Sequence, residues 1–389
     1  MNMPDPATRP WSIAFVEDDD DMRRQVKEYL EGETLSFGSV TVTPMASFES
    51  ALALLQERKI DLVILDVFRG ETSQGNRAGL DVLRAWQATG FAPVVLYTAL
   101  PEGLQEYCNT FVRLVPKESG NLGRLVKEIE GLFSSKIPQL HRAIIEHLDT
   151  SLRDYMWKFV VANWEEIGSL VIRPDFVRLL LHRLGLQFSR VGVGAVVERL
   201  YPGLPGGDPE AEKVHPAEYY IKPPLGPDPM LGDLRVLKRG EGENIFAVVW
   251  PSCDLVHRGG KCKIERALCA RALPVESFEE HIKWAAEATP SESATKALKS
   301  LIANNRTIGQ AERYHFLPAA WDIPSIVLDF QELEHVGVAE LKAAPCLATV
   351  ASPFAESIGA RFIRYLGRLG TPDLDIELAL AGLRKSGTS

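Results

Sequence analysis

A short apolar run that ends directly in an acid, Leu62–Leu65 followed by Asp66, constrains this chain more than any other feature. Such a run is typical of a strand that is covered on both faces of its sheet, as strands of parallel sheets are. In open parallel sheets, ligands gather at the carboxyl ends of the strands. The sequence therefore predicts a parallel sheet with Asp66 at its ligand-binding edge.

Further apolar runs flank this one and alternate with amphipathic stretches. We expect strands over Ile13–Val16, Val40–Thr43, Leu62–Leu65, Pro93–Tyr97 and Phe111–Val115. We expect helices over Met22–Leu30, Phe48–Glu57, Ala78–Ala88, Glu102–Cys108 and Asn121–Phe133. Five strand–helix units in a row predict an α/β fold with a doubly wound, five-stranded parallel sheet.

Polar residues suited to phosphoryl transfer follow four of these strands. Glu17 and Asp18 follow the first strand, Asp66 the third, Thr98 the fourth and Lys117 the fifth. Transfer to a carboxylate needs a nucleophile that the phosphoryl group can reach in line, and a divalent cation held by oxygen ligands. It also needs a fixed cation and a hydroxyl for the remaining phosphoryl oxygens. The strand ends supply all of these groups.

On these residues, the segment 10–134 resembles the receiver domain of two-component response regulators, which has a flavodoxin-like fold. The resemblance implies that Asp66 is the phosphoacceptor and that Thr98 and Lys117 hold the phosphoryl group. It implies a Mg²⁺ site made by Glu17, Asp18, Asp66 and the backbone carbonyl of Phe68. It also implies a histidine kinase or phosphotransfer protein as the phosphodonor.

Three features depart from the family's pattern. The loop Phe68–Gly79 is longer than usual, and Leu114 stands where the family has its aromatic switch residue, three positions before Lys117. Glu118 replaces the proline that commonly follows the lysine. We therefore expect the phosphorylation chemistry to be kept and the response to run through the long loop.

We expect three domains: a receiver over 1–135, a helical region or linker over 136–200, and an α+β output domain over 201–389. Helices are expected over Leu140–Leu148, Ser151–Trp164 and Asp175–Leu184, with Pro174 opening the last one. The output domain should hold strands at Leu234–Leu237, Ile245–Trp250, Ala267–Ala272 and Ile326–Asp329, and helices at Phe278–Glu287, Ser291–Asn304 and Ile358–Leu369. Because Ser134–Lys136 is short and Pro138 hinders a continuous helix, the receiver and the helical region should be in contact.

The output segment carries no motif that names its chemistry. Cys253, His257, Cys262 and Cys269 could ligate zinc, but no Cys-x₂-Cys pair occurs, and we expect no structural zinc. An alternative is a catalytic effector gated by the receiver, with Cys253 as nucleophile and His257 or His315 as base. One face of the last expected helix is basic, because it carries Arg361, Arg364 and Arg368. We expect this face to be solvated; the alternative is that it binds an anion or the acidic surface of a partner.

The charge distribution bears on the partners. Residues 1–135 carry 13 Lys and Arg against 20 Asp and Glu, within a chain of net charge −9, so nucleic-acid binding is disfavoured and a DNA-binding output is the weakest alternative. No stretch is apolar enough to span a bilayer, and the N-terminus lacks a signal peptide. Five cysteines suit a reducing compartment, so we expect a cytoplasmic protein.

The function expected from the sequence is therefore that of a phosphorelay response regulator. Its receiver would catalyse transfer of a phosphoryl group from the donor to its own Asp66, and would control a C-terminal output domain that acts through protein–protein interaction. No separate enzymatic output is identifiable, and the sequence leaves the oligomeric state open.

Overall fold

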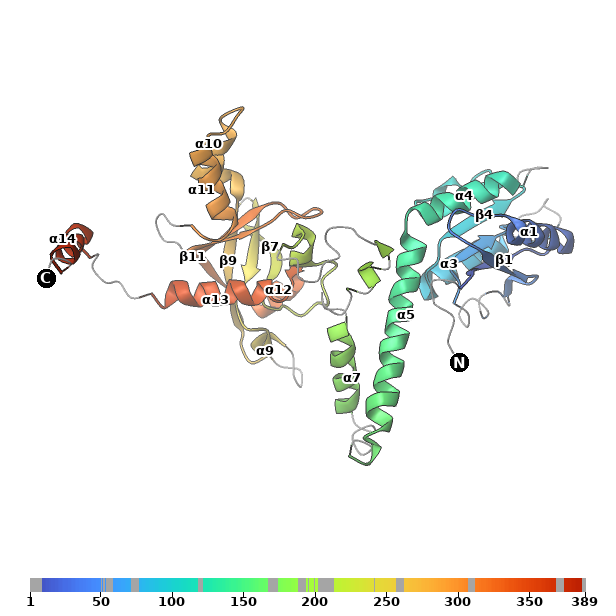
Figure 1. The fold of residues 1–389 in the computed structure, drawn as a ribbon, viewed down its shortest axis with the longest axis horizontal. Coiled ribbons are helices and arrows are strands. Elements are labelled where there is room, and N and C mark those ends of the chain that lie inside the picture. The colour runs from blue at the N-terminus through green and yellow to red at the C-terminus, as the bar shows by residue number, and fades with distance from the viewer. Residues whose placement is uncertain are drawn as a thin grey trace. The chain divides into compact units, whose positions relative to one another are not determined.

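The computed structural model describes residues 9–49, 51, 53, 59–70, 77–117, 122–166, 174–187, 194, 196–198, 200–201, 213–240, 242–256, 262–306, 312–368 and 374–386. The chain divides into two compact units, Met1–Ala211 and Glu212–Ser389 (Figure 1). Each unit has a sheet of its own.

The first unit contains a five-stranded parallel sheet of order β2-β1-β3-β4-β5 (Figure 1). Its strands are β1 (Trp11–Val16), β2 (Val40–Met45), β3 (Leu62–Leu65), β4 (Val94–Thr98) and β5 (Val112–Pro116). The predicted doubly wound, flavodoxin-like fold is confirmed. The strand order reverses between β1 and β3, which is where ligands bind in sheets of this kind.

Helices cover both faces of this sheet. On one face, α3 (Ala78–Thr89) buries Leu80, Leu83 and Trp86 against the strands. On the other face lie α1 (Asp20–Gly32) and α4 (Leu122–Ser134). The Asp19 side chain caps α1 by accepting a hydrogen bond from the Met22 amide at 2.9 Å, so the helix starts directly after the acidic strand end.

Two predicted helices of this unit have different outcomes. The helix expected over Glu102–Cys108 is reduced to one 3₁₀ turn, Gln105–Tyr107. Gly103 has a φ of +71°, and an α-helix cannot include that left-handed conformation. The helix expected over Phe48–Glu57 lies largely outside the described residues.

A long helix follows the sheet. Lys136 has a φ of +63° and separates α4 from α5 (Ile137–Tyr155), which has Pro138 in its first turn. A π-helical segment, η3 (Met156–Val161), continues α5, so the two helices predicted over 140–164 form one run. No Gly or Pro separates them in the sequence. The third predicted helix is α7 (Pro174–Gln187), and Pro174 does begin it.

The helix α5 docks on the amino-terminal edge of the sheet. Arg142 donates to Asp61 Oδ1 through Nε at 2.9 Å, and its Cζ lies 3.5 Å from the Trp11 ring centroid. Asp61 Oδ2 accepts from the Ser12 amide at 2.8 Å, which ties the same carboxylate to β1. The predicted contact between the sheet domain and the helical region is therefore present. It lies at the opposite end of the strands from Asp66.

The second unit is built on a seven-stranded sheet of order β10-β11-β9-β8-β7-β12-β6, in which every pair is antiparallel. Its strands are β6 (Tyr220–Ile221), β7 (Asp233–Arg239), β8 (Gly242–Val248), β9 (Arg266–Pro274), β10 (Tyr314–Leu317), β11 (Ile326–Gly337) and β12 (Cys346–Val350). An α+β unit was predicted, and the strands β7, β8, β9 and β11 were located. The shorter β6, β10 and β12 were not.

Helices also cover this second sheet. On one face α13 (Phe354–Leu366) buries Ile358 and Phe362. The other face is covered in two places, by α9 (Ser252–Leu255) with α12 (Val338–Ala343), and by α10 (Glu279–Ala285) with α11 (Glu292–Ile302), which stand together in Figure 1. The last helix of the unit is α14 (Ile376–Ser386).

Candidate functional site

A cavity of about 380 Å³ opens at the carboxyl edge of the parallel sheet. Its lining includes all six residues that the sequence predicted for the site: Glu17, Asp18, Asp66, Phe68, Thr98 and Lys117. They come from the ends of β1, β3, β4 and β5, which are distant in sequence and adjacent in the sheet. The fold therefore brings the predicted residues together.

Lys117 is held between two buried carboxylates. Its Nζ lies 2.6 Å from Asp66 Oδ2 and 2.5 Å from Glu17 Oε2. The backbone amide of Lys117 donates to the Thr98 carbonyl at 2.7 Å, which fixes the end of β5 against the end of β4. The ammonium group therefore has a set position beside the carboxylate of Asp66.

The backbone around Asp66 is closely packed. Asp66 Oδ1 accepts from the Val67 amide at 2.7 Å, which orients the carboxylate. A Cβ added at Gly79 would lie 2.0 Å from the Asp66 carbonyl oxygen and 2.7 Å from the Val67 Cα. Only glycine fits at this approach of α3 to the end of β3. Sequence reasoning missed Gly79, although a glycine at the start of an expected helix was a signal for it.

Three carboxylates converge on one side of the cavity. One oxygen each from Glu17, Asp18 and Asp66 lies within 4.8 Å of the others, and no other such group of acids, histidines or cysteines occurs among the described residues. Asp18 Oδ2 also accepts from the Gly70 amide at 2.7 Å. Hard divalent cations such as Mg²⁺ prefer carboxylate oxygens, so this donor set fits a metal.

The charges in the cavity perturb two titrations. Burial raises the pKa of Glu17 to about 7, although the neighbouring Lys117 acts in the opposite direction. Burial lowers the pKa of Lys117, but the negative charges of Asp66 and Glu17 outweigh that effect and leave the pKa above its ordinary value. A divalent cation bound beside Glu17 would offset the energetic cost of burying its negative charge.

Thr98 is fully buried, and its hydroxyl has no hydrogen-bond partner among the described residues. A buried hydroxyl without a partner costs about 1–3 kcal/mol. Since Thr98 lines the cavity together with Asp66 and Lys117, a ligand placed there would supply the missing partner.

The aromatic residue beside Lys117 lies on β4, whereas the receiver pattern places its aromatic residue on β5. Leu114 is half-buried and packs against the core beside α3. Tyr97 on β4 is buried, and its ring centroid lies 5.8 Å from Lys117 Nζ. Sequence reasoning missed Tyr97. Residues 71–76 of the long loop, and Glu118, lie outside the described residues.

The structure does not bring Cys253 and His315 together. Cys253 is exposed on α9, which follows β8, whereas His315 is buried on β10. Two strands, β11 and β9, separate β10 from β8, so at about 4.8 Å per strand the two elements lie roughly 14 Å apart. That is beyond the reach of a hydrogen bond. His257 lies outside the described residues.

The remaining cysteines of the second unit are packed into the protein. Cys269 is buried on β9, and burial raises the pKa of its thiol to about 12. Cys262 donates from Sγ to the Leu255 carbonyl at 3.2 Å. Burial likewise lowers the pKa of His315 to about 3, so this histidine is neutral at physiological pH.

The predicted basic face of α13 is only partly solvated. Arg361 is buried, which corrects the expectation for this residue, and it donates to the Tyr314 carbonyl at 2.7 Å. Tyr314 lies on the edge strand β10, so the guanidinium satisfies a backbone group at the sheet edge. Arg364 is exposed and donates to Glu312 at 3.4 Å, and Arg368 donates to the Tyr365 hydroxyl at 3.0 Å.

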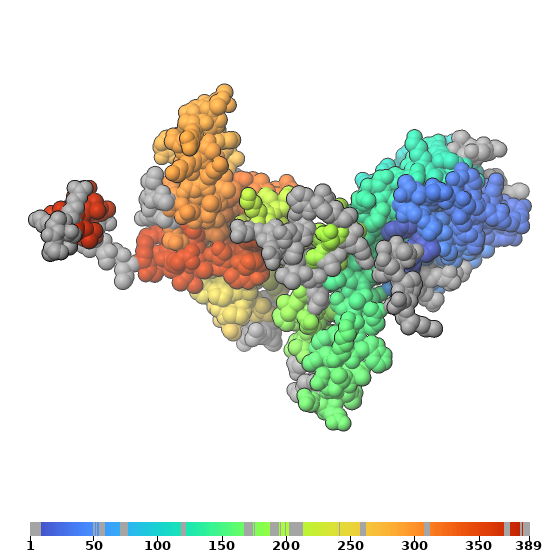
Figure 2. Space-filling view, viewed as in Figure 1, coloured from blue at the N-terminus to red at the C-terminus, as the bar shows by residue number. Residues whose placement is uncertain are grey.

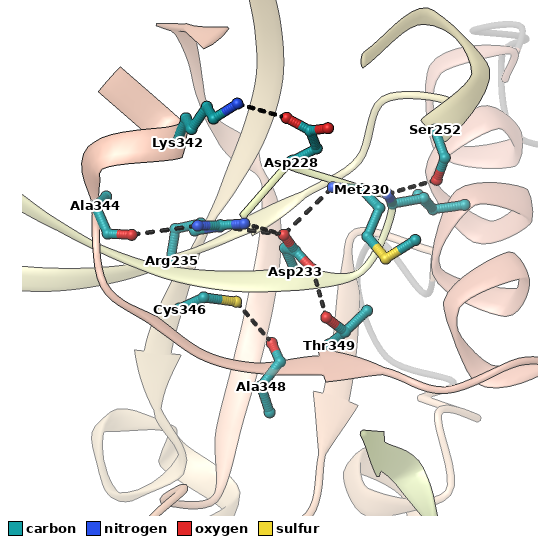
Figure 3. A network of polar contacts seen from close by, with 11 residues as sticks. Asp228, Met230, Asp233, Arg235, Ser252, Lys342, Ala344, Cys346, Ala348 and Thr349 are labelled. Carbon is teal, nitrogen blue, oxygen red and sulfur yellow. Dashed lines mark hydrogen bonds and ion pairs between the residues drawn. The ribbon is translucent and has the colours of Figure 1, made fainter. Parts of the chain in front are cut away.

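A buried polar network in the second unit is complete in itself (Figure 3). Asp233 Oδ2 lies 2.5 Å from Arg235 Nη2, and Asp233 Oδ1 accepts from Thr349 Oγ1 at 2.6 Å. Arg235 also donates to the Ala344 carbonyl at 3.2 Å. Every charged group drawn here has a partner, so the network joins β7 to β12 and offers no open position for a ligand.

No family model matches this chain, and no curated protein matches it. Solved structures do match its N-terminal third. The chemotaxis protein CheY4 of Vibrio cholerae is 20% identical, with 32% of this chain and 99% of that chain covered and a TM-score of 0.26. The receiver domain of the hybrid histidine kinase CckA is 28% identical (31% and 98% covered, TM-score 0.23). The Mn²⁺-bound form of the response regulator Rcp1 is 22% identical (32% and 94% covered, TM-score 0.26).

These matches are to response-regulator receiver domains. At such low TM-scores the strand order and the geometry of the cavity, and not the matches, define the fold and the site. We refer to residues 9–134 as the receiver-like domain. Within the described part of the chain, no helix has the length and apolar character needed to cross a membrane.

Proposed function

We propose that this protein is a response regulator of a phosphorelay, in which Asp66 accepts a phosphoryl group from a histidine kinase or phosphotransfer protein in a Mg²⁺-dependent step. One observation carries the proposal. The buried Thr98 hydroxyl has no partner among the described residues and lines the same cavity as the Asp66 carboxylate and the Lys117 ammonium. Those are a nucleophile, a fixed cation and a free hydroxyl in one place.

In the proposed reaction a carboxylate oxygen of Asp66 attacks the phosphorus atom of the donor. A new P–O bond forms while the bond from phosphorus to the donor's imidazole nitrogen breaks, and the imidazole leaves with the electron pair. The Val67 amide orients the carboxylate at 2.7 Å. Asp66 is only slightly exposed, so its carboxylate is largely shielded from bulk water before the transfer.

Glu17, Asp18 and Asp66 would hold the metal, together with the Phe68 carbonyl. When bound, Mg²⁺ neutralises charge on the phosphoryl oxygens and offsets the repulsion between the acids. Lys117 lies 2.6 Å from Asp66 and would pair with one phosphoryl oxygen. The Thr98 hydroxyl would donate to another.

We propose the domain organisation of a receiver over 1–135, a helical region over 136–200 and an output domain over 201–389. An output that acts by binding another protein is favoured over a catalytic one, because Cys253 and His315 are too far apart to share a catalytic site. Cys253 lies on α9, which follows β8, and His315 lies on β10, with β11 and β9 between the two strands.

We also propose that the response runs through the loop Phe68–Gly79. The usual route, from the threonine to an aromatic on the fifth strand, has Leu114 in its aromatic position. In addition, only a 3₁₀ turn lies between β4 and β5. Hydrogen exchange with and without a phosphate mimic should change in the loop. A change confined to Tyr97–Val115 would contradict this route.

Phosphorylation is tested with a small-molecule phosphodonor and Mg²⁺, followed by a mobility shift on a phosphate-affinity gel. Asp66→Ala should remove the shifted band. Asp81→Ala, whose side chain is 79% exposed on α3, removes the same charge and should label like the unchanged protein. Equal labelling of the Asp66→Ala protein would refute the assignment of the phosphoacceptor.

Metal binding is tested with Mn²⁺ as a paramagnetic probe. Asp18→Ala should weaken binding by roughly tenfold or more, because it removes one of three charged ligands. The Lys117→Ala protein should still bind the ion. When it is phosphorylated, its hydrogen exchange should not change as it does in the unchanged protein. Unchanged Mn²⁺ affinity in the Asp18→Ala protein would exclude Asp18 as a ligand.

A further inference from the structure

The helix α7 exposes apolar side chains on more than one of its sides. Phe176 is buried, whereas Val177, Leu179, Leu181 and Leu186 are 53%, 48%, 61% and 51% exposed. The apolar sides of a helix are normally buried against a core or a partner. The described residues of the first unit therefore leave this helix incompletely covered.

The end of the preceding helical run has the same character. In and just after the π-helical segment η3, Trp157 is 68% exposed, Phe159 42%, Val161 52% and Trp164 52%. Figure 2 shows this end of the helical region, in green, as open surface in that view. Exposed aromatic clusters of this size mark interaction surfaces.

The helices α5 and α7 pack against each other and form a two-helix hairpin (Figure 1). A cavity of about 390 Å³ lies between them, lined by side chains that include Asp154, Lys158 and Arg183. Two helices have too few neighbours to bury a full core, and four-helix bundles solve this by packing two such hairpins together.

We propose that this hairpin, which we define as the described residues 149–166 and 174–187, is the surface through which two copies of the chain form a dimer. The charge of the hairpin fits a second copy of itself. Its described residues include four Lys and Arg and five Asp and Glu, so they are close to neutral, with a net charge of −1 in a chain of net charge −9. Two copies can therefore meet here without the like-charge repulsion that the acidic receiver-like domain would impose.

The exposed apolar area of the hairpin is also large enough for a stable dimer interface. The eight exposed apolar side chains named above, four from α7 and four from the end of the preceding helical run, are about half accessible on average. They offer on the order of 800 Å², which is about one partner's share of a stable interface. Covering them should favour association by several orders of magnitude in the dimerisation constant.

The attachment of α5 keeps this surface apart from the phosphorylation site. Arg142 fixes α5 to Asp61 and Trp11 at the amino-terminal edge of the parallel sheet, and Asp66 lies at the opposite, carboxyl edge. A dimer formed through the hairpin leaves the cavity open to a phosphodonor. The dimer proposal therefore does not rest on the proposed phosphorylation.

The test is the mass of the full-length chain by light scattering after size exclusion, over about 1–100 µM, a range in which weak dimers dissociate. We expect twice the chain mass at the upper end. Trp157→Glu and Leu181→Glu should each weaken dimerisation by at least tenfold. Leu225→Glu, at a side chain 72% exposed in the second unit, is the matched control and should remain dimeric.

A second measurement separates lost dimerisation from lost folding. Hydrogen exchange of the unchanged protein should show protection of 157–164 and 174–187 that rises with protein concentration, while 11–16 stays constant. A monomer at every concentration would overturn the proposal and leave the second unit of the same chain to cover the hairpin. A dimer that both hairpin variants leave intact would also overturn it.

Discussion

Replacing Glu17 by Gln should stabilise the metal-free receiver-like domain at alkaline pH. Glu17 is 1% exposed, and burial raises its pKa from 4.5 to about 7. Gln keeps the size of the side chain and removes the charge that is costly to bury. Lys117 retains Asp66 at 2.6 Å as its partner.

The magnitude follows from the shift. Since the folded pKa lies above the unfolded value, the Glu17 contribution to stability is fully present below about pH 4.5 and is lost as the pH rises through 7. One pKa unit corresponds to about 1.4 kcal/mol, so the loss between pH 5 and pH 8 is about 2–3 kcal/mol. The Glu17→Gln protein should not show this loss.

The assay is urea unfolding with EDTA present, at pH 5 and pH 8, followed by pulsed hydrogen exchange of residues 11–16 and 62–65. These segments are β1 and β3, so they report on the receiver-like domain alone. The stability difference between variant and unchanged protein should grow by about 2–3 kcal/mol from pH 5 to pH 8. Any effect of the amide on packing is the same at both pH values and cancels.

Glu102→Gln serves as the control, because it removes a carboxylate that is exposed in the same domain. It should show no such pH dependence. With Mg²⁺ added at pH 8, the unchanged protein should gain stability by ligand binding, and the Glu17→Gln protein should gain much less. A Glu17→Gln protein whose stability difference is the same at both pH values would refute the reasoning.

Three further predictions concern other parts of the molecule. Arg142→Ala removes the guanidinium partner of buried Asp61, which directly precedes β3, and should destabilise the docking of α5 by about 3 kcal/mol. The loss should appear as faster hydrogen exchange in 137–155; unchanged exchange there would contradict it. Gly79→Ala should destabilise the receiver-like domain by about 1–3 kcal/mol and reduce phosphorylation of Asp66, because the new methyl group would clash with the backbone at Asp66. Normal phosphorylation and normal stability of this variant would show that the backbone shifts to make room for the methyl group. The second unit should lose about 2 kcal/mol between pH 7 and pH 5, since the folded pKa of His315 is about 3 and only the unfolded state takes up the proton. His315→Leu should remove this loss and His335→Gln should not, which urea unfolding at the two pH values would decide.

The sequence by itself determined the parallel sheet and the residues at its edge. Strands buried on both faces are apolar throughout, so Leu62–Leu65 was recognisable without any tertiary information. The side chain after such a strand lies at the edge where ligands bind, which placed Asp66, Thr98 and Lys117 in one cavity. Both inferences depend on local pattern and on the regular geometry of βα units.

Only the tertiary structure decided how the remaining side chains are used. Nothing in the sequence pairs Asp61 with Arg142, which lie 81 residues apart. The burial of Arg361 was equally hidden, because its role is to satisfy a carbonyl on β10, a strand too short to recognise from its pattern. Contacts of this kind depend on which elements become neighbours, and a local pattern does not contain that information. The helix α7 combines both cases. Its sequence shows apolar side chains that need to be covered, and the fold shows which of them the described residues of the first unit leave exposed.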